Sequence, residues 1–280
     1  MKPTRIGNVD LEVESNMKTR VISGLCMVPL LAFVFLGGYW LTAMCILIAL
    51  MGLKELFQGF EAMDIKPSLA VAYGSTAVLY LIHGFFPMQH EFILAWLAAS
   101  IMASSIYIFK IEERKVEDAM ATLLGIVYVV FLSYHVTLVD QTQEYAKLVW
   151  LVLISAFATD IFAYFSGYLF GRHGRHKLCP NLSPKKTWEG AIGGTLGSII
   201  CCGLFGYFVF PRIWVHCLII GAIGAIMAQC GDLTASAYKR KMGIKDYGTL
   251  IPGHGGIMDR FDSVLFTAPV VYYYIVLVLQ

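Results

Sequence analysis

The sequence predicts an all-α, polytopic integral membrane protein with about nine transmembrane helices, and three observations support this fold class. Hydrophobic residues make up 58% of the 280 residues and charged residues only 14%, against about 45–50% apolar and about 25% charged residues in an average soluble domain. Apolar runs close to the roughly 20 residues that cross a hydrocarbon core recur from Val21 to the end of the chain. Most polar connections between these runs are short. A soluble fold of this composition would lack the polar side chains that cover a surface.

The apolar runs, taken in chain order between polar breaks, set the positions of the predicted spans. They lie near residues 21–37, 39–53, 68–85, 92–109, 119–138, 147–170, 190–210, 213–231 and 262–279. Lys18 and Arg20 precede the first run, as in a signal peptide, but Gly37-Gly38-Tyr39-Trp40 after it is a poor cleavage site. We therefore expect the first run to remain as a membrane anchor.

Small residues four positions apart mark the seventh and eighth runs, at Gly190/Gly194 and Gly221/Ala225. Such pairs let helix backbones approach closely in lipid, where no hydrophobic effect drives association. We therefore expect them to form packing surfaces between helices.

The distribution of Lys and Arg predicts the orientation in the membrane, because short basic loops resist translocation. With the amino terminus in the cytoplasm, only Lys147 and Arg212 of the 21 basic residues fall on the outer side. We therefore expect the amino terminus and the polar loops in the cytoplasm and the carboxyl terminus outside.

Charge, cysteine content and missing motifs exclude several classes of function. The net charge of +2 is too small to indicate a nucleic-acid partner. The seven cysteines have no CxxC spacing and all except Cys179 lie in apolar runs, which is typical of packing residues rather than disulfides or zinc ligands. The sequence also lacks the P-loop, the HExxH motif and the GxSxG elbow.

Two carboxylates lie in or at the end of apolar runs, where ionisable groups are costly and therefore candidates for function. Asp160 lies within the sixth run and Asp232 at the end of the eighth. For Asp160 a structural role, hydrogen-bonded to a neighbouring helix, stays open beside a functional one. If the eighth helix continues through Gly231, one helix face carries Asp232, Ser236, Lys239 and Arg240.

The segment after this helix adds further polar groups. Lys245 and Asp246 precede a Gly-rich turn over 251–256, and Asp259 and Asp262 then lie three positions apart at the start of the last helix. Carboxylates without thiolates favour Mg²⁺, which usually bridges a few carboxylates to substrate phosphates. Basic side chains and the amides of a Gly-rich turn suit a triphosphate. His254 in this turn could be a base, a phosphate donor or a turn residue.

A second polar loop lies before the seventh run and contains Lys185 and Lys186. A lysine pair beside a span is commonly a topology signal. Because Ser183, Thr187 and the glycine at the helix start flank this pair, it is also a candidate phosphate clamp.

The polar pattern of the C-terminal half resembles that of the phosphatidate cytidylyltransferase family, the CDP-diacylglycerol synthases. The pattern reads Ser236-x-x-Lys239-Arg240-x₄-Lys245-Asp246-x-Gly248-x-x-Ile251-Pro252-x-His254-Gly255-Gly256-x-x-Asp259-Arg260-x-Asp262, and Ser183-Pro184-Lys185-Lys186-Thr187-Trp188-Glu189-Gly190 is similar to a second motif of that family. The resemblance covers about 160–262. It implies transfer of CMP from CTP to phosphatidic acid, giving CDP-diacylglycerol and pyrophosphate in phospholipid biosynthesis. It also implies a requirement for Mg²⁺. Because the sequence offers no thiolate or histidine cluster, we expect Mn²⁺ to act as a substitute.

The resemblance, together with the residue types, assigns a role to each polar residue. We expect catalytic roles for Asp232, Ser236, Lys239, Asp246 and Asp259. We expect Lys185, Lys186, Arg240, Lys245, His254 and Arg260 to bind substrate phosphates, and Asp232, Asp259 and Asp262 to bind metal. The chain would then comprise a cytoplasmic tail over 1–20, a transmembrane scaffold over 21–145 and a catalytic transmembrane region over 146–280.

Two other functions fit parts of the same pattern. A CTP-dependent lipid kinase of the dolichol kinase type would transfer the γ-phosphoryl group instead of CMP. A transporter of an anion or a phosphorylated lipid would need access from both faces, whereas the polar clusters crowd one side. The partners expected are CTP, phosphatidic acid and membrane lipid, and the oligomeric state stays open, with a homodimer as one option.

Overall fold

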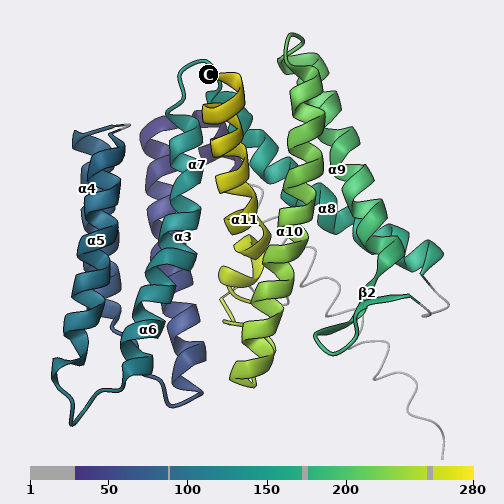
Figure 1. Ribbon diagram of the computed structural model, residues 1–280. Coiled ribbons are helices and arrows are strands. Elements are labelled where there is room, and N and C mark those ends of the chain that lie inside the picture. The colour runs from purple at the N-terminus through teal and green to yellow at the C-terminus, as the bar shows by residue number, and fades with distance from the viewer. Residues whose placement is uncertain (1–28, 88, 172–175, 251–254) are drawn as a thin grey trace, which may run out of the picture.

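The computed structural model describes residues 29–87, 89–171, 176–250 and 255–280, and in them long helices run back and forth between two ends of the molecule (Figure 1). The first group of elements is α2 (Leu30–Leu36), α3 (Gly38–Glu61), α4 (Leu69–Phe85), α5 (His90–Ile106), η1 (Tyr107–Phe109), α6 (Val116–Gly125), η2 (Ile126–Phe131) and α7 (Leu132–Asp140). The second group is η3 (Ala146–Leu148), α8 (Val149–Phe170), β1 (Lys177–Cys179), β2 (Ser183–Thr187), α9 (Trp188–Val209) and α10 (Trp214–Met242), and the chain ends with α11 (Met258–Tyr274) and η4 (Ile275–Leu279).

The helices confirm the prediction of an all-α polytopic membrane protein. Within the described residues, seven helical segments are long and apolar enough to cross a membrane, and α4 is a shorter apolar helix. The predicted count of nine is not confirmed. The first predicted span covers 21–37, and its part before residue 29 lies outside the described residues. Within the described part, α2 belongs to this span.

Two helices extend well past the spans that hydropathy predicts. The second span was expected to end at 53, but α3 continues to Glu61, and the eighth was expected to end at 231, but α10 continues to Met242. The physical reason is that hydropathy reports contact with lipid, whereas a helix continues as long as its backbone hydrogen bonds are made. The continuation of α10 through Gly231 places Asp232 and Lys239 on one helix, as expected.

The loop between α8 and α9 contains a short antiparallel hairpin that the sequence did not predict. Strands β1 and β2 pair with Lys177 opposite Thr187 and Cys179 opposite Ser183. The hairpin leads directly into α9, because Thr187 is the N-cap residue of that helix and its hydroxyl accepts from the amide of Gly190 at 3.1 Å.

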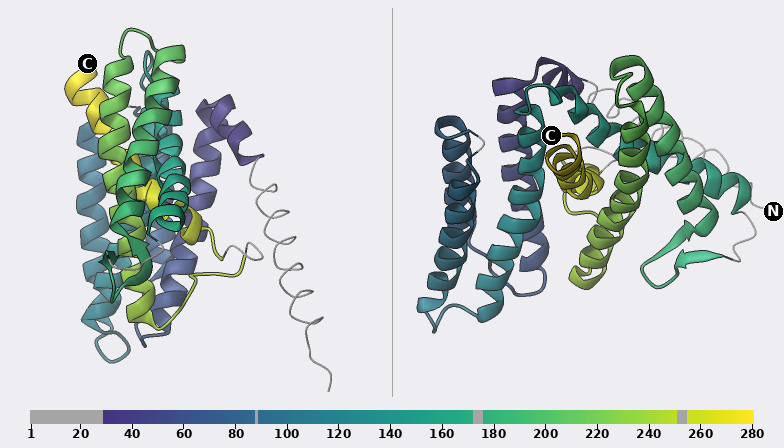
Figure 2. Two further views of the ribbon diagram at one scale, coloured as in Figure 1. Left: turned by 90° about the vertical axis from the view of Figure 1, so that its right-hand side faces the viewer. Right: turned by 45° about the horizontal axis from the view of Figure 1, so that its top comes forward.

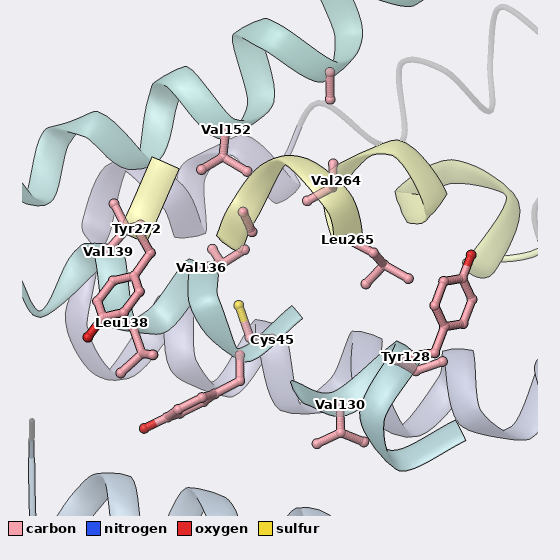
Figure 3. Packing of buried hydrophobic residues seen from close by; sticks show 14 of the residues in the cluster. Cys45, Tyr128, Val130, Val136, Leu138, Val139, Val152, Val264, Leu265 and Tyr272 are labelled. Atoms are coloured by element: carbon pink, nitrogen blue, oxygen red, sulfur yellow. The ribbon is translucent and has the colours of Figure 1, made fainter. Parts of the chain in front are cut away.

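Helix α11 lies between two groups of helices (Figures 1 and 2). It contacts α3 and α7 on one side and α8 and α10 on the other. Figure 3 shows buried side chains around it, among them Val139 of α7, Val152 of α8, and Val264 and Leu265 of α11 itself. This central position makes α11 the structural link between the two groups.

Small residues bring the helices of the second group close together. A Cβ atom on Gly194 of α9 would lie 2.7 Å from the carbonyl oxygen of Thr159 in α8, and one on Gly231 of α10 would lie 2.6 Å from the carbonyl oxygen of Asp262 in α11. The expected packing role of Gly194 is therefore confirmed. The contact at Gly231 also brings the neighbouring Asp232 close to the first turns of α11.

Several connections that are rich in basic residues lie at one end of the molecule. Figure 1 shows the α3–α4 and α5–α6 connections and the β hairpin at this end. The connection between α9 and α10, which contains Arg212, and the carboxyl terminus lie at the opposite end. We call the first of these ends the basic end.

Candidate functional site

A cavity of about 580 Å³ lies among α8, the β hairpin, α9, α10 and the start of α11. Its apolar wall includes Ala163, Tyr164 and Leu178. Its acidic and basic lining residues are Asp160, Lys185, Lys186, Asp232, Lys239, Asp246, Asp259, Arg260 and Asp262. Residues that are far apart in the sequence thus line one cavity, which combines acidic, basic and apolar surface.

Asp232 connects α10 to the hairpin. Its carboxylate accepts a hydrogen bond from the hydroxyl of Ser236, one turn later, at 3.4 Å. It also forms an ion pair with Lys186 of β2. Both charged side chains stay partly exposed, at 30% for Asp232 and 26% for Lys186. The pair is therefore open to the cavity, and either group can turn toward a substrate.

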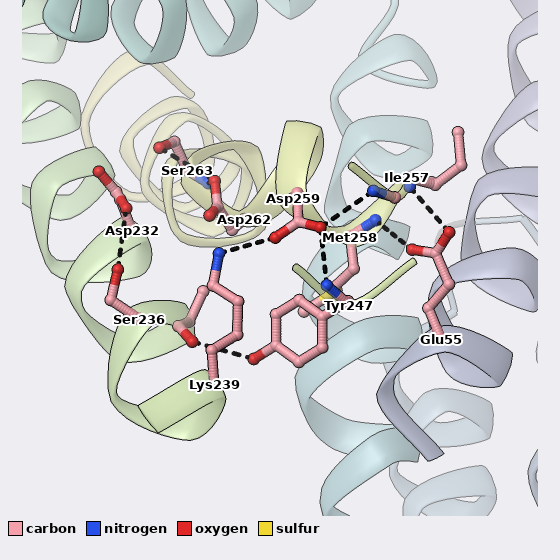
Figure 4. A network of polar contacts seen from close by, with 12 residues as sticks. Glu55, Asp232, Ser236, Lys239, Tyr247, Ile257, Met258, Asp259, Asp262 and Ser263 are labelled. Atoms are coloured by element: carbon pink, nitrogen blue, oxygen red, sulfur yellow. Dashed lines mark hydrogen bonds and ion pairs between the residues drawn. The ribbon is translucent and has the colours of Figure 1, made fainter. Parts of the chain in front are cut away.

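Asp259 has the most completely satisfied carboxylate in the cavity (Figure 4). Its Oδ1 accepts from Lys239 Nζ at 2.7 Å, and its Oδ2 accepts from the amides of Tyr247 at 2.8 Å and Gly256 at 2.9 Å. The Asp259 side chain is only 3% exposed. A carboxylate held by a cation and two amides keeps one orientation, which is what a ligand for a cation or a positioning group needs.

Tyr247 supports this arrangement from the loop after α10. Its hydroxyl donates to the carbonyl oxygen of Ala235 at 3.1 Å, and its ring lies 5.4 Å from Lys239 Nζ. Burial, followed by the nearby Asp259 charge, raises the pKa of the Tyr247 phenol well above its usual value. Tyr247 therefore acts as a neutral hydrogen-bond donor that fixes the loop against α10.

Two further carboxylates line the cavity. Asp262 lies one turn after Asp259 and is buried, and its Oδ1 accepts from the amide of Ser263 at 2.7 Å. Asp160 reaches the cavity from α8. Of the two roles left open for Asp160, the position on the cavity wall favours the functional one.

The remaining predicted residues differ in their relation to the cavity. Asp246 and Arg260 line it, whereas Arg240 and Lys245 are exposed and stand outside its lining. Ser236 also stands outside the lining and contacts it through Asp232. His254 lies outside the described residues. The roles assigned to these residues from the sequence stay predictions.

The sequence did not single out Glu55, a buried residue of α3. Its carboxylate accepts hydrogen bonds from the amides of Ile257 and Met258, directly before Asp259 (Figure 4). The one available signal was a pair of charged residues, Lys54 and Glu55, after an apolar run. That signal is weak, because charged residues after a span normally lie in a loop.

The donor atoms of the cavity suit a hard cation that is shared with a substrate. The carboxylates of Asp232, Asp259 and Asp262 offer oxygen atoms, which Mg²⁺ and Mn²⁺ prefer. Among the described residues, no group of three or more His, Cys, Asp or Glu side chains is arranged to hold a metal ion. Mg²⁺ commonly binds through one or two carboxylates plus phosphates. Three carboxylates in one cavity fit a cation that takes only part of its ligands from the protein.

Comparison with known proteins gives consistent results over nearly the whole chain. The model described as the cytidylyltransferase family matches residues 18–278. A phosphatidate cytidylyltransferase of Synechocystis sp. is 34% identical over 295 residues, which cover 93% of this chain and 97% of the relative. Those of Staphylococcus haemolyticus and Staphylococcus aureus are 35% identical over 264 residues and 32% over 259 residues, covering 90% of this chain and 94% and 96% of the relatives.

Proposed function

Because this chain belongs to the cytidylyltransferase family, we propose that it transfers CMP from CTP to phosphatidic acid, forming CDP-diacylglycerol and pyrophosphate. The chain is a nucleotidyltransferase of phospholipid biosynthesis. The observation that carries the choice of substrates is the cavity, which combines basic side chains for phosphates with an aromatic wall that contains Tyr164 and Tyr168. The family membership favours neither the lipid kinase nor the transporter.

The reaction needs positioning and charge neutralisation more than it needs a base. The phosphate of the lipid is already ionised at neutral pH, and it attacks the α-phosphorus of CTP in line while pyrophosphate leaves. Basic groups that face the cavity lower the repulsion between the two anions. Lys185, Lys186 and Arg260 supply these charges, and the ion pair with Asp259 holds the Lys239 ammonium group in place.

A divalent cation would be held by Asp232, Asp259 and Asp262. Mg²⁺ supplies neutralisation of phosphate charge and alignment of the leaving group when it is bound. Lys186 forms an ion pair with Asp232, and Lys239 forms one with Asp259. These two carboxylates therefore also keep a lysine in reach of the substrate phosphates.

The aromatic wall of the cavity is suited to a lipid substrate. Tyr164 and Tyr168 lie one turn apart on α8 and are 70% and 53% exposed. Tyrosine is enriched where hydrocarbon meets water, because its ring is apolar and its hydroxyl is polar. The glycerol and acyl chains of phosphatidic acid would pass this wall while the phosphate reaches the lysines.

We also propose that the basic end faces the cytoplasm, with the amino terminus on the same side and the carboxyl terminus outside. The support is the concentration of Lys and Arg at this end, which the positive-inside rule places in the cytoplasm. A reporter fused to Gln280 that is active only outside the cytoplasm should give signal. Signal only from a cytoplasmic reporter would contradict this orientation.

The test of the function is to identify the product. Purified enzyme in detergent receives CTP labelled in the cytidine ring together with phosphatidic acid and Mg²⁺. We expect the label in the lipid fraction and one pyrophosphate released for each labelled lipid. A phosphorylated lipid without the cytidine label would indicate a kinase, and no turnover with phosphatidic acid would contradict the proposal.

A further inference from the structure

Glu55 is a buried carboxylate that no part of the proposed chemistry uses. It belongs to α3, in the first group of helices, and it is 7% exposed. Its Oε1 accepts from the amide of Ile257 at 3.0 Å, and its Oε2 accepts from the amide of Met258 at 2.8 Å. A buried carboxylate is costly unless its oxygens are satisfied. Both oxygens of Glu55 are satisfied by one short segment more than 200 residues away.

This segment is the N-terminus of α11, where a helix leaves amides without partners. The N-cap residue, Ile257, has no side chain that can cap the helix. Glu55 therefore caps α11 from another helix, and its negative charge lies at the positive end of the helix dipole. The capped turn is also the turn from which Asp259 enters the cavity.

Two glycines leave the space that Glu55 occupies. A Cβ atom on Gly248 would lie 2.6 Å from Glu55 Oε1, and a Cβ atom on Gly256 would also overlap the carboxylate. Gly256 donates its own amide to Asp259 at 2.9 Å. The same turn thus contacts Glu55 on one side and Asp259 on the other (Figure 4).

We propose that Glu55 is a positioning residue, which holds the first turn of α11 so that Asp259 keeps its orientation toward Lys239 and the cavity. The proposal rests on the proposed function only in its kinetic test, because the exchange measurement needs no turnover. It gives the first group of helices a part in the reaction, although none of its side chains lines the cavity among the described residues.

The main variant is Glu55→Gln, and its matched control is Glu61→Gln on the exposed last turn of the same helix. Glutamine keeps the size of the side chain but offers only one acceptor oxygen and no charge. A displacement of about 1 Å at a reacting group can cost about 100-fold. We therefore expect Glu55→Gln to lower kcat by about 10- to 100-fold while KM for CTP changes less than about threefold.

The second readout needs neither substrate nor metal. Hydrogen–deuterium exchange of the peptide that contains residues 256–262 should become about tenfold faster in Glu55→Gln, because one of the two capped amides loses its acceptor and the hydrogen bond to the other loses the carboxylate charge. Glu61→Gln should match the wild type in both readouts. A purely structural role would instead lower the yield of folded enzyme and leave kcat per folded molecule and the exchange of this peptide unchanged, and that result would overturn the proposal.

A second variant displaces Glu55 without removing its charge. Gly248 does not have a positive φ, so alanine fits its backbone, but the new Cβ would push on the carboxylate. Gly248→Ala should reproduce the loss of kcat and the faster exchange. Gly74→Ala is its control, because nothing lies within 4 Å of a Cβ at that helical position.

The outcomes separate this proposal from the proposed function. A wild-type enzyme without turnover would contradict the function, and the exchange data would still report on the turn. If the wild type is active and Gly248→Ala has the same kcat and the same exchange rates as the wild type, the positioning role is contradicted. The same holds if both variants lost folded protein while the folded remainder behaved like wild type.

Discussion

The two groups of helices on either side of α11 use their polar side chains in different ways. In the first group, neutral side chains pair within the helical layer: His83 Nδ1 and the Tyr134 hydroxyl are 3.1 Å apart, and the Ser75 and Ser100 hydroxyls are 2.6 Å apart. In the second group, charged side chains face a cavity, as Asp232 and Lys186 do. The buried carboxylates of the first group, Glu55 and Asp118, accept from backbone amides instead of facing the cavity. The first group thus uses its polar side chains to hold the helices together, whereas the second group also presents charges that can act on a ligand.

The largest effect expected in the second group comes from removing divalent metal. Because carboxylate oxygens are the available donors, activity should disappear in excess EDTA and return with Mg²⁺ or Mn²⁺. The measurement is pyrophosphate release from CTP before and after each addition. Full activity in EDTA would be incompatible with a metal role for Asp232, Asp259 and Asp262.

The next largest effect is expected for Asp232→Asn. This change removes the charge of the carboxylate that pairs with Lys186. We expect kcat to fall by about 10²- to 10⁴-fold, which corresponds to a loss of at least ~3 kcal/mol of transition-state stabilisation. Turnover is measured at saturating Mg²⁺ with equal amounts of folded protein.

Asp160→Asn should have a smaller effect on turnover than Asp232→Asn. Asp160 lines the cavity from α8 but belongs to neither of the lysine–aspartate pairs. We expect a loss of about tenfold in kcat, with part of the effect on thermal stability. If Asp160→Asn were inactive and Asp232→Asn nearly normal, the site would have to be centred on α8.

Lys186→Met should act mainly on substrate binding. The side chain is partly exposed in its pair with Asp232, so its loss should have little effect on folding. We expect KM for CTP or for phosphatidic acid to rise about tenfold, as for the loss of a charge-assisted contact to phosphate. An unchanged KM for both substrates would remove Lys186 from the phosphate-binding set.

The smallest effect is expected for Tyr134→Phe in the first group. The change removes the hydrogen bond to His83 and no charge. Interhelical hydrogen bonds in membranes contribute about 0.6 kcal/mol on average, so the melting temperature should fall slightly. Turnover should stay within about twofold of wild type. A loss of turnover comparable with that of Asp232→Asn would contradict the division between the two groups.

The sequence predicts the helical fold and much of the cavity, because both depend on local patterns. Apolar runs identify membrane helices, and helical spacing places Asp232 and Lys239 on one face of α10. The pairing of Lys239 with Asp259 could not be predicted, because it depends on the path of the loop between α10 and α11. The sequence also failed to predict the hairpin. Strand Ser183–Thr187 has only five residues and contains a proline, which cannot donate to a neighbouring strand, so the segment resembles a loop. Proline is tolerated in an edge strand such as this one.

Glu55 shows where hydropathy fails for a physical reason. Its position after a predicted span suggests a loop, but α3 continues past it and buries it against α11. Its partners are backbone amides, which leave no trace in side-chain patterns. Only the three-dimensional approach of α3 to α11 identifies it.

The most direct test of the division between the two helix groups is a parallel assay of Asp232→Asn and Tyr134→Phe. Both variants, purified to equal amounts of folded protein, receive labelled CTP, phosphatidic acid and saturating Mg²⁺. The account predicts that Asp232→Asn loses at least about 100-fold in kcat while Tyr134→Phe keeps at least about half of the wild-type value. Near-normal turnover in Asp232→Asn, or a comparable loss in Tyr134→Phe, would contradict it.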